Sequence, residues 1–519
     1  MRTRRMRPKP PASHFERWPT AAIALLIVLA TAVVTALAPG ASGLGATAGR
    51  AARTPSPARV DARVTLAAGS PISVPRSFLG ISAEYWTIPI WAREPQLLRR
   101  VFSLLSTDGP ARLRIGGDSA DRSQWSPTKE LPEWVFELTP SWLRQTSSIV
   151  RQTGTRLILD LNTMSSTPQL AARWAKTAIA GLPQGSIRAF EVGNEPDIYN
   201  QSKWQHLTAG RGAPPAPSRI TAESYARSFG AYARAVARVD RGVPLLAPAL
   251  AEPQRNSIWI SKLLAFPHPK LTGITAHRYP YSACARPGAP TFPSIPRVLS
   301  ENATAGMGRT ALDLEHITDP ARLPLWMTEI NSVTCGGTRG VSNAFATALW
   351  APDALLELIK AGTEAAFVHV RPPLVNMAFS LTRKGLTAHP LLYGLALFAR
   401  MLAPGAQLVP LRLAASRPLD LKTWAVRANG RVMHVLLLNK GARDLRVRLE
   451  LPHLRVATVQ WLRAPNVSST TGVTLAGQRL TRAATWAGKP RTQRVTASAK
   501  GLLIGVPRYS AALIATHLR

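Results

Sequence analysis

The stretch "IRAFEVGNEPD" (residues 187–197) ends an apolar run with three carboxylates, at Glu191, Glu195 and Asp197. Burying a charged group costs free energy, so carboxylates gathered at the end of a hydrophobic segment usually have a function there. Short apolar segments of the same kind recur along the chain, and most of them end in polar or charged residues. The other seven are "FLGISAE" (78–84), "ARLRIGGDS" (111–119), "TRLILDLN" (155–162), "PLLAPAL" (244–250), "LTGITAHRY" (271–279), "LPLWMTE" (323–329) and "AAFVHV" (365–370).

Helix-like stretches such as "SYARSFGAYARAVARV" (224–239) and "FATALWAPDALLELIKA" (345–361) separate these segments. In the second stretch Phe345, Leu349, Leu356 and Ile359 fall on one helical face, whereas Pro352 predicts a kink or a new helix start. Eight alternations of strand and helix predict a (β/α)8 barrel, an α/β fold. In such a barrel the polar residues that end the strands meet at one face.

The pattern changes after Pro404, where short alternating runs are separated by turn signals such as Asn429–Gly430. Several short strands without intervening helices predict an antiparallel β-sandwich. The stretch "ARVTLAAGSPISV" (62–74) has the same character and is expected to add a strand to that sandwich. We therefore expect such a strand in residues 60–75, the barrel in 76–402 and the sandwich in 403–519.

The N-terminus has the pattern of an export signal. Residues 1–18 are strongly basic, and residues 20–38 contain no charge. The apolar run is close to the ~20 residues that a membrane span needs, so residues 1–38 are either a cleaved signal or an uncleaved signal-anchor. The basic residues ahead of it predict that the bulk of the protein lies outside the membrane, secreted or anchored through residues 20–38. Residues 39–59 are rich in Pro, Gly and Ala and are expected to form a flexible stalk.

Composition excludes several classes of protein. Hydrophobic residues make up 46% of the 519 positions, so the chain can bury a large core and is not a disordered protein. Lys and Arg number 64 against 28 Asp and Glu. This excess has two explanations: a generally Arg-rich composition, or attraction to a polyanion such as an acidic polysaccharide. No nucleic-acid motif accompanies it, so we expect no nucleic-acid partner, and no Cys/His cluster indicates a zinc site.

Two glutamates at strand ends suit a defined chemistry. Glu195 ends the fourth segment and Glu329 the seventh, on opposite sides of the expected barrel mouth. Glycoside hydrolysis needs one carboxylic acid to protonate the leaving oxygen and one carboxylate to attack the anomeric carbon, with the two ~5–5.5 Å apart in retaining enzymes. Pro196 is expected to keep Glu195 extended. Unrelated surface glutamates are the alternative, and neither interpretation requires a metal or cofactor.

The chain resembles glycoside hydrolase family 79, the β-glucuronidase and heparanase-like enzymes, from about residue 60 to its end. The matching motifs include "FLGISAEYW", "LRIGGDSADRS", "FEVGNEPD", "GITAHRYP" and "TEINSVTCGG", with "GVTLAGQRL" and "GVPRYSAALIATHL" in the tail. The resemblance implies that Glu195 is the general acid/base and Glu329 the nucleophile. It also implies that the glycone pocket is formed by Glu84, Asp118, Asn162, His277 and Tyr279.

The resemblance further implies how a uronic acid is recognised. Backbone amides and an aromatic hydroxyl of the loop after the nucleophile would receive the substrate carboxylate, and Thr334 and Gly336 occupy that place here. Family members often have Tyr where this chain has Thr334, and "HVRPPLVNMAFS" (369–380) lacks an expected Tyr. Arg339 or Arg371 could instead supply a charge-assisted contact, or each could be a surface residue.

Several neighbouring residues are expected to support the pair. Asn194 can hydrogen-bond a sugar hydroxyl beside the reacting carbon. Tyr279 can hold Glu329 ionised through a hydrogen bond, while His277 is either a pocket residue or a structural one. Glu191 is expected to be buried and paired with Arg114, although Arg114 could instead orient Glu329.

The two cysteines, Cys284 and Cys335, follow the sixth and seventh strands, whose loops are neighbours at the same face of the barrel. We expect a disulfide that closes a loop of roughly 50 residues and stabilises the fold by about 4 kcal/mol on the chain-entropy model. Two free thiols are the alternative.

Together these observations predict an exported retaining β-glycosidase that acts on β-glucuronides. Two alternatives stay open. One is a β-glycosidase for neutral sugars on the same barrel, and the other is a surface protein that binds polysaccharide without cleaving it.

Overall fold

The computed structural model describes residues 60–126, 131, 134–201, 219–428 and 432–517. The predicted leader and stalk, residues 1–59, lie outside the described residues. Among the residues that are described, no helix combines the length and the apolar character needed to cross a membrane.

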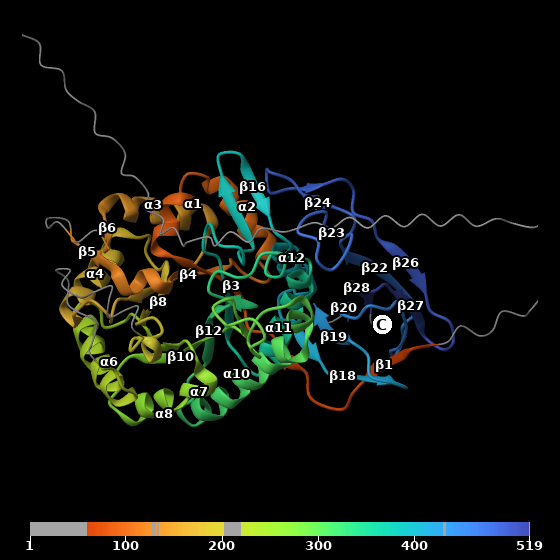
Figure 1. The fold of residues 1–519 in the computed structure, drawn as a ribbon, viewed down its shortest axis with the longest axis horizontal. Coiled ribbons are helices and arrows are strands. Elements are labelled where there is room, and N and C mark those ends of the chain that lie inside the picture. The colour runs from red at the N-terminus through yellow and green to blue at the C-terminus, as the bar shows by residue number, and fades with distance from the viewer. Residues whose placement is uncertain (1–59, 127–130, 132–133, 202–218, 429–431, 518–519) are drawn as a thin grey trace, which may run out of the picture. The chain divides into compact units, whose positions relative to one another are not determined.

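Eight parallel strands close into a barrel, as the sequence predicted (Figure 1). Each overlaps one of the eight apolar segments: β3 (Leu79–Glu84), β4 (Arg112–Gly116), β7 (Leu157–Leu161), β8 (Ile187–Val192), β9 (Leu245–Leu250), β10 (Leu271–Arg278), β12 (Leu325–Ile330) and β14 (Ala365–His369). β14 pairs with β3, which closes the ring. Most positions of these strands are buried, because barrel strands have the packed interior on one side and helices on the other.

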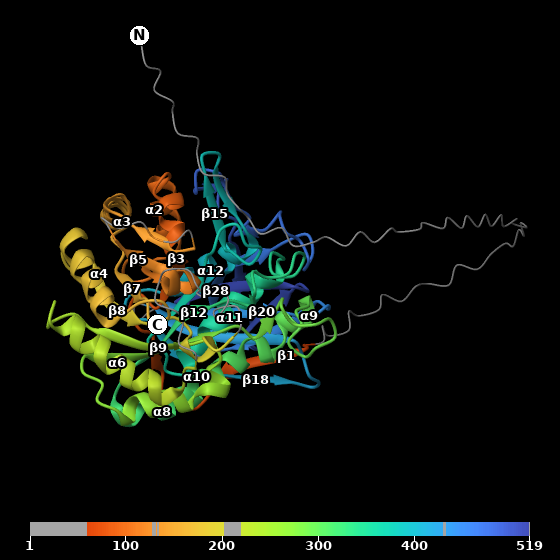
Figure 2. The same ribbon diagram turned by 60° about the vertical axis from the view of Figure 1, so that its left-hand side comes forward.

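Helices cover the outside of the barrel, as Figures 1 and 2 show. The longer ones are α2 (Pro95–Leu105), α3 (Pro140–Thr153), α4 (Pro168–Gly181), α6 (Ala222–Ala237), α8 (Ile258–Ala265), α10 (Ala305–Thr318), α11 (Ala346–Lys360) and α12 (Pro390–Met401). Short elements decorate the strand ends: η1 (Tyr85–Thr87), η2 (Gly117–Arg122), η3 (Pro196–Ile198), β11 (Tyr281–Ser282) and β13 (Val333–Thr334).

The predicted new helix start at Pro352 is wrong, because α11 runs through this proline as one helix. Nearly every residue of α11 is buried, so its tertiary packing outweighs the local cost of the proline. Pro352 cannot donate a hydrogen bond to the carbonyl of Ala348. Gly394 of α12 packs against that carbonyl so closely that a Cβ there would lie 2.4 Å from the Ala348 oxygen.

The C-terminal part forms two sheets that pack as a sandwich. One contains β18 (Leu411–Ala415), β1 (Ala62–Leu66), β21 (Leu445–Glu450) and β27 (Leu502–Val506). The other contains β2 (Ile72–Ser73), β17 (Gln407–Val409), β19 (Leu421–Ala428), β20 (Val432–Asn439), β28 (Ser510–His517), β22 (Val456–Arg463) and β23 (Thr474–Leu475), with β26 (Gln493–Thr496) paired to β22. β1 therefore lies in the sandwich, yet it pairs parallel to β21, which departs from a purely antiparallel arrangement.

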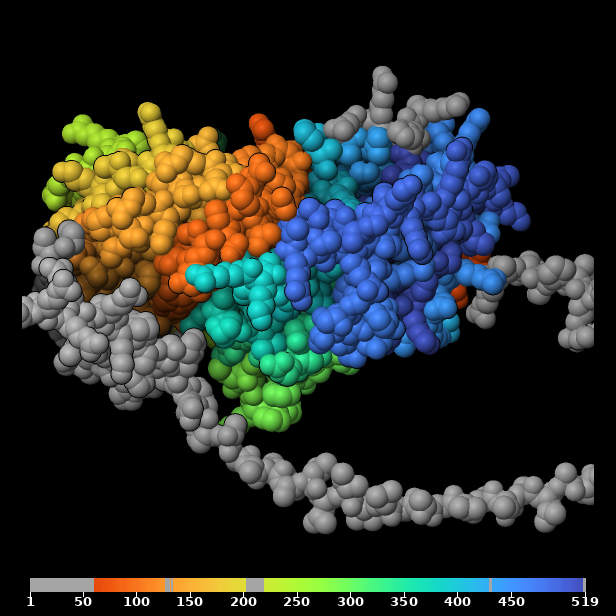
Figure 3. Space-filling model, turned by 90° about the horizontal axis from the view of Figure 1, so that it is seen from above, coloured from red at the N-terminus to blue at the C-terminus, as the bar shows by residue number. Residues whose placement is uncertain are grey.

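The sandwich packs against the barrel through α11 and α12, and Figure 3 shows the blue C-terminal segments beside the orange and teal segments of the barrel. Charged side chains are buried at this contact. Lys440 of the loop after β20 lies 2.8 Å from Asp353 of α11, and Lys422 of β19 lies 2.8 Å from Glu357 of α11. These ion pairs connect the sandwich to the barrel.

Candidate active site

The carboxylates of Glu195 and Glu329 converge at the end of the barrel where the strands terminate. Glu329 lies in β12, and Glu195 follows β8 by three residues. One oxygen of each carboxylate and one ring nitrogen of His277 lie within 4.8 Å of one another. Carboxyl groups ~5–5.5 Å apart are typical of retaining glycosidases, whereas inverting enzymes separate them by ~6.5–9.5 Å to admit a water. An upper limit of 4.8 Å between the two oxygens falls on the retaining side of this division.

The backbone of Glu195 is not extended, so the expectation drawn from Pro196 is wrong. Glu195 has φ 53° and ψ 49°, in the left-handed region. The chain turns sharply after β8, and the amide of Glu195 donates to the carbonyl of Ala249 at 3.0 Å. The carboxylate of Asp197 secures the same turn by accepting hydrogen bonds from the amides of Ala251 and Glu252, at 2.8 and 3.0 Å. A strained backbone held by its neighbours is characteristic of functional sites.

Arg114 of β4 occupies the centre of the barrel end and is completely buried. Its guanidinium contacts three carboxylates, at 2.6 Å from Glu191, 2.7 Å from Asp160 and 2.8 Å from Glu329. The predicted pairing with Glu191 is confirmed, and the alternative contact with Glu329 exists as well. One guanidinium can serve both because its donors diverge in a rigid plane. Arg114 thereby holds the Glu329 carboxylate in place.

Glu329 is held in its ionised form. Burial by itself would raise the pKa of this carboxyl, but His369, His277, Arg114 and a hydrogen bond from Tyr279 outweigh burial and lower the pKa to about 2. The Tyr279 hydroxyl donates to Glu329 Oε1 at 2.8 Å, as the sequence predicted. His369 lies 3.4 Å from the other oxygen. Glu329 is therefore a carboxylate at neutral pH, which a nucleophile requires.

His277 lies in the barrel interior and contacts the carboxylate of Glu195. Its Nδ1 lies 3.0 Å from Glu195 Oε1. Burial and the nearby charge of Arg114 lower the pKa of His277 to about 4, so the ring is neutral at neutral pH. A neutral imidazole beside Glu195 can exchange one hydrogen bond with it in either protonation state of the carboxyl.

Asp160 of β7 faces Arg114 and Glu191 and completes the buried network. Burial raises the pKa of Asp160 well above its usual range. Burial acts in the same direction on Glu191, but Arg114 outweighs it and lowers the pKa of Glu191. Within this buried pair a proton is therefore favoured on Asp160 rather than on Glu191.

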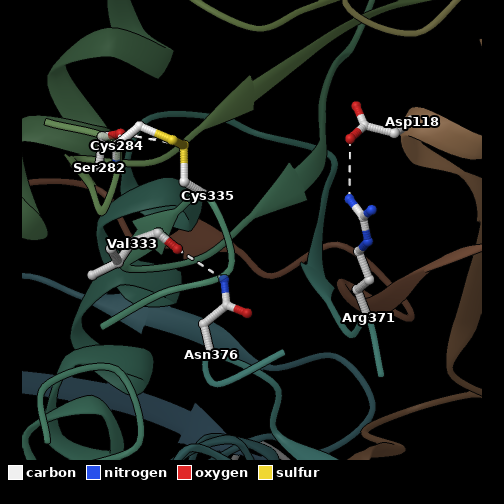
Figure 4. The surroundings of a disulfide bond; sticks show 7 residues. All are labelled: Asp118, Ser282, Cys284, Val333, Cys335, Arg371 and Asn376. Carbon is white, nitrogen blue, oxygen red and sulfur yellow. Dashed lines mark hydrogen bonds and ion pairs between the residues drawn. A yellow bond between two sulfur atoms is a disulfide. The ribbon is translucent and has the colours of Figure 1, made fainter. Parts of the chain in front are cut away.

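Glu84 and Asp118 lie beside this network, and their role in a sugar pocket stays a prediction. Glu84 ends β3 and accepts a hydrogen bond from the Ser119 amide at 2.8 Å. Arg371, which follows β14, lies 3.4 Å from Glu84 and 3.0 Å from Asp118, and Figure 4 shows it facing Asp118. Arg371 is thus a paired residue of the barrel mouth rather than an isolated surface arginine. Its guanidinium also stacks 5.2 Å from the ring centre of Trp86.

Asn162 and Asn194 are committed to the fold. The Asn162 amide nitrogen donates to the Ser123 carbonyl and to the Ser165 hydroxyl, and its oxygen accepts from the amides of Met164 and Ser165. Asn162 therefore shapes the loop after β7, and its placement as a sugar-binding residue gains no support from these contacts. The side-chain oxygen of Asn194 accepts from Arg114 at 2.9 Å, which fixes the residue next to Glu195.

The loop after β12 is fixed by the predicted disulfide, because Cys284 and Cys335 are bonded (Figure 4). β13, which contains Thr334, pairs with β11, and Cys335, Gly336 and Gly337 all have positive φ, at 55°, 78° and 84°. The carbonyl of Gly336 accepts from the amides of Val375 and Asn376, at 3.0 and 3.2 Å. The loop is therefore tightly bound to its neighbours, and Figure 4 shows it across from Arg371 and Asp118.

His369 and Asp160 escaped sequence reasoning. His369 ends β14, the strand noted only for its missing Tyr, and its ring lies between Glu329 and Glu84, 3.4 and 3.7 Å away. Burial lowers the pKa of His369, but Glu329 and Glu84 outweigh it and raise the pKa overall. Two signals were present: a histidine at a strand end in "AAFVHV", and a lone charge inside the apolar "LILDL".

The solved structures that resemble this one are glycoside hydrolases. A 4-O-α-L-rhamnosyl-β-D-glucuronidase from Fusarium oxysporum 12S, in complex with Rha-GlcA, has a TM-score of 0.69 at 15% identity and covers 88% of this chain and 100% of its own. An α-L-arabinofuranosidase from Thermotoga maritima has a TM-score of 0.64 at 15% identity, covering 89% and 100%. The family 51 α-L-arabinofuranosidase AbfB from Bifidobacterium longum has 0.64 at 16%, covering 88% and 100%.

At these identities the likeness shows the fold: this chain has the barrel-and-sandwich architecture of glycoside hydrolases. No family model matches the sequence, and no curated protein sequence matches it. The chemistry therefore has to be argued from the geometry of the barrel mouth.

Proposed function

We propose that the protein is a retaining β-glycosidase that hydrolyses β-glucuronides, with Glu329 as the nucleophile and Glu195 as the general acid/base. The observation that carries this proposal is the convergence of the two carboxylates, with an oxygen of each within 4.8 Å of the other and of His277. A protein that only binds polysaccharide has no need of a carboxylate pair at this spacing, so the geometry favours catalysis over the non-catalytic alternative.

The first step is attack by Glu329 on the anomeric carbon. Arg114 and Tyr279 hold its two oxygens, which orients the carboxylate and keeps it ionised. A carbon–oxygen bond forms between Glu329 and the sugar while the glycosidic bond breaks. Glu195 gives its proton to the departing oxygen in the same step.

The second step reverses the roles. Glu195, now a carboxylate, takes a proton from a water that attacks the anomeric carbon and releases Glu329. His277 contacts Glu195 and is neutral, so it can stabilise the carboxyl before and after proton transfer without adding a charge. The left-handed backbone of Glu195 and the hydrogen bonds to Asp197 keep the side chain in reach of both events.

Three features support a glucuronide as the substrate: the resemblance to family 79, the fold shared with a rhamnosyl-glucuronidase, and Arg371 at the barrel mouth. Asp118 is about one-third exposed, so it can leave Arg371 when a substrate carboxylate takes its place. The neutral-sugar alternative is favoured by a different observation. Arg371 already contacts two carboxylates, Glu84 and Asp118, and both acids can bind sugar hydroxyls instead.

A pair of aryl glycosides separates these possibilities. We expect the full-length protein to hydrolyse 4-nitrophenyl β-glucuronide at least about 100-fold faster than the matching glucoside, in terms of kcat/KM, because one charge-assisted contact differs between them. Arg371→Gln should abolish most of that preference while leaving glucoside hydrolysis in place. Equal rates on both substrates would contradict the glucuronide assignment, and no hydrolysis of any aryl glycoside would contradict the enzyme assignment.

The N-terminal pattern adds a proposal about location. We propose that residues 1–38 export the protein, which is then secreted or held at the membrane through residues 20–38. N-terminal sequencing of the exported protein distinguishes the two, because a secreted form begins after the apolar run and an anchored form retains that run.

A further inference from the structure

A hollow of about 350 Å³ lies away from the barrel strands, between α12 and the larger sheet of the sandwich. Arg400 of α12 lines one side, and His434, Thr458 and Gln460 line it from strands β20 and β22. Leu513 and Ala515 of β28 contribute the apolar part. Ligand sites commonly occupy clefts of ~300–1,000 Å³ at such contacts between domains.

The polar residues of this hollow lie in register across three neighbouring strands. His434 pairs with Ala515, and Ala515 pairs with Thr458 on its other side. Gln460 pairs with Leu513 in the next row. On the central strand Ala515 thus lies between two polar neighbours, whereas Leu513 lies between Leu436 and Gln460, which gives the hollow a hydrophobic floor with polar residues at its edges.

Three of these polar side chains are each fixed by one of their own polar atoms. His434 Nδ1 lies 2.8 Å from the Met401 carbonyl, and Gln460 Oε1 accepts from Arg400 Nη1 at 3.1 Å. Gln478, which also lines the hollow, donates from Nε2 to the Gly488 carbonyl at 2.6 Å. The guanidinium of Arg400 is held further by the ring of Trp486, at 4.7 Å. The side chains are therefore preorganised before any ligand arrives.

The opposite ends of these side chains offer a mixed set of hydrogen-bonding groups. They are the Nε2 of His434, the amide nitrogen of Gln460, the amide oxygen of Gln478 and the hydroxyl of Thr458. Sugar hydroxyls both donate and accept, so alternating donors and acceptors above an apolar floor match a carbohydrate. No carboxylate lines the hollow and Arg400 does, so a negatively charged sugar meets one favourable charge and no unfavourable one among the described lining residues.

We propose that this hollow is a second carbohydrate-binding site, which holds a uronic-acid-containing stretch of the polysaccharide outside the active site. The proposal rests on the proposed function only for the identity of the sugar, since the lining residues are independent of Glu195 and Glu329. Such a site would raise the local concentration of polymer and would leave small substrates unaffected.

Binding can be tested on the full-length Glu329→Gln protein, titrated calorimetrically with a hyaluronan hexasaccharide, which contains β-linked glucuronic acid. We expect two sites per chain. Adding Thr458→Trp, which fills the groove, should remove one of them, and adding Gln460→Ala should weaken it at least about tenfold by deleting a hydrogen-bonding group on a preorganised wall. Gln493→Ala, on β26 beside β22 but outside the lining, serves as the matched control and should leave both sites intact.

Activity provides the independent reading. In the otherwise wild-type chain, Thr458→Trp should leave kcat/KM for 4-nitrophenyl β-glucuronide within about twofold, because it is remote from the pair. The two proposals can fail separately. If Thr458→Trp removes the second binding site but the wild-type protein hydrolyses no aryl glycoside, the site is supported and the proposed function is refuted. If neither Thr458→Trp nor Gln460→Ala changes the stoichiometry or affinity, the proposed site is overturned. If uncharged cellohexaose binds as tightly as the hyaluronan hexasaccharide, the proposed preference for acidic sugars is overturned.

Discussion

Two regions of this molecule bury charged side chains, and they do so in opposite ways. At the contact between barrel and sandwich, two lysines of the sandwich face two buried acids of α11. Lys440 pairs with Asp353 and Lys422 with Glu357, and both lysines also reach the largely exposed Glu301. At the barrel mouth, by contrast, acids outnumber the arginines. Arg114 faces three carboxylates, and Arg371 faces Glu84 and Asp118, with Glu195 close by.

The difference distinguishes buried charges that only stabilise the fold from buried charges that can take part in acid–base chemistry. Balanced pairs need no change in protonation to be buried, so they connect two domains and do little else. A surplus of carboxylates cannot remain ionised together, so their pKa values move apart, with Glu329 lowered to about 2 and Asp160 raised well above its usual range. Titratable groups separated in this way are a mark of acid–base sites.

The largest expected effect follows from Glu329→Gln. This change keeps the size of the side chain but removes the nucleophile, so kcat on an aryl β-glucuronide should fall by at least about 10,000-fold. The melting temperature should fall, because the ionised carboxylate of Glu329 stabilises the fold and Gln cannot replace its ion pair with Arg114. Near-normal turnover in steady-state assays would contradict the assignment.

Glu195→Gln should give the next largest effect. We expect a loss of activity of roughly 100- to 10,000-fold, and its size should depend on the leaving group. A dinitrophenyl leaving group needs no proton, so its first step should be nearly unaffected, whereas a poorly activated aryl group should show the full loss. Burst kinetics with the dinitrophenyl substrate measure this difference. An equal loss for both leaving groups would argue against Glu195 as the acid.

Tyr279→Phe tests the hydrogen bond that keeps Glu329 ionised, and kcat/KM should fall by roughly 10- to 100-fold. The carboxyl of Glu329 has its pKa lowered from 4.5 to about 2, so its ionisation stabilises the fold above pH 4.5, and this contribution is lost as the pH falls through 2. Removing the Tyr279 hydrogen bond should raise this pKa and move the acid limb of the kcat/KM profile to higher pH. A lower rate with an unmoved limb would show that Tyr279 acts on something other than the ionisation of Glu329.

Lys440→Met should have the smallest effect on turnover and a large one on stability. It leaves Asp353 buried without its cation, which costs about 3–5 kcal/mol in the free energy of unfolding. The double variant Lys440→Met/Asp353→Leu removes both charges and should recover most of that loss. Urea unfolding of the full chain measures the free energy of unfolding of both variants. If the folded Lys440→Met protein had a lower kcat, the ion pairs between barrel and sandwich would not be purely structural.

Local patterns in the sequence were sufficient for the fold and for the convergence of Glu195 and Glu329. Apolar segments ending in polar residues located all eight barrel strands, because barrel topology brings their ends to one face whatever the loops do. The resemblance and the strand ends together indicated Glu195 and Glu329, and the mouth brings these two together.

What could not be predicted depends on contacts that are distant in sequence. The uninterrupted α11 depends on packing against α12, and the left-handed Glu195 depends on a hydrogen bond to Ala249 in the next strand. His369 gains its importance from Glu84 and Glu329, on two other strands. The assignment of Asn162 to the sugar pocket came from the resemblance alone and stays a prediction, while the observed contacts of its side chain hold the loop after β7.

The most direct test of the central claim is to trap the intermediate. Incubating the full-length protein with 2-deoxy-2-fluoro-β-glucuronyl fluoride slows both steps and lets a covalent adduct accumulate if the mechanism is retaining. We expect mass spectrometry to find one added sugar per chain, on the peptide that contains Glu329, and none on the Glu329→Gln variant. An adduct on any other residue, or hydrolysis of aryl glucuronides with inverted configuration and no adduct, would contradict it.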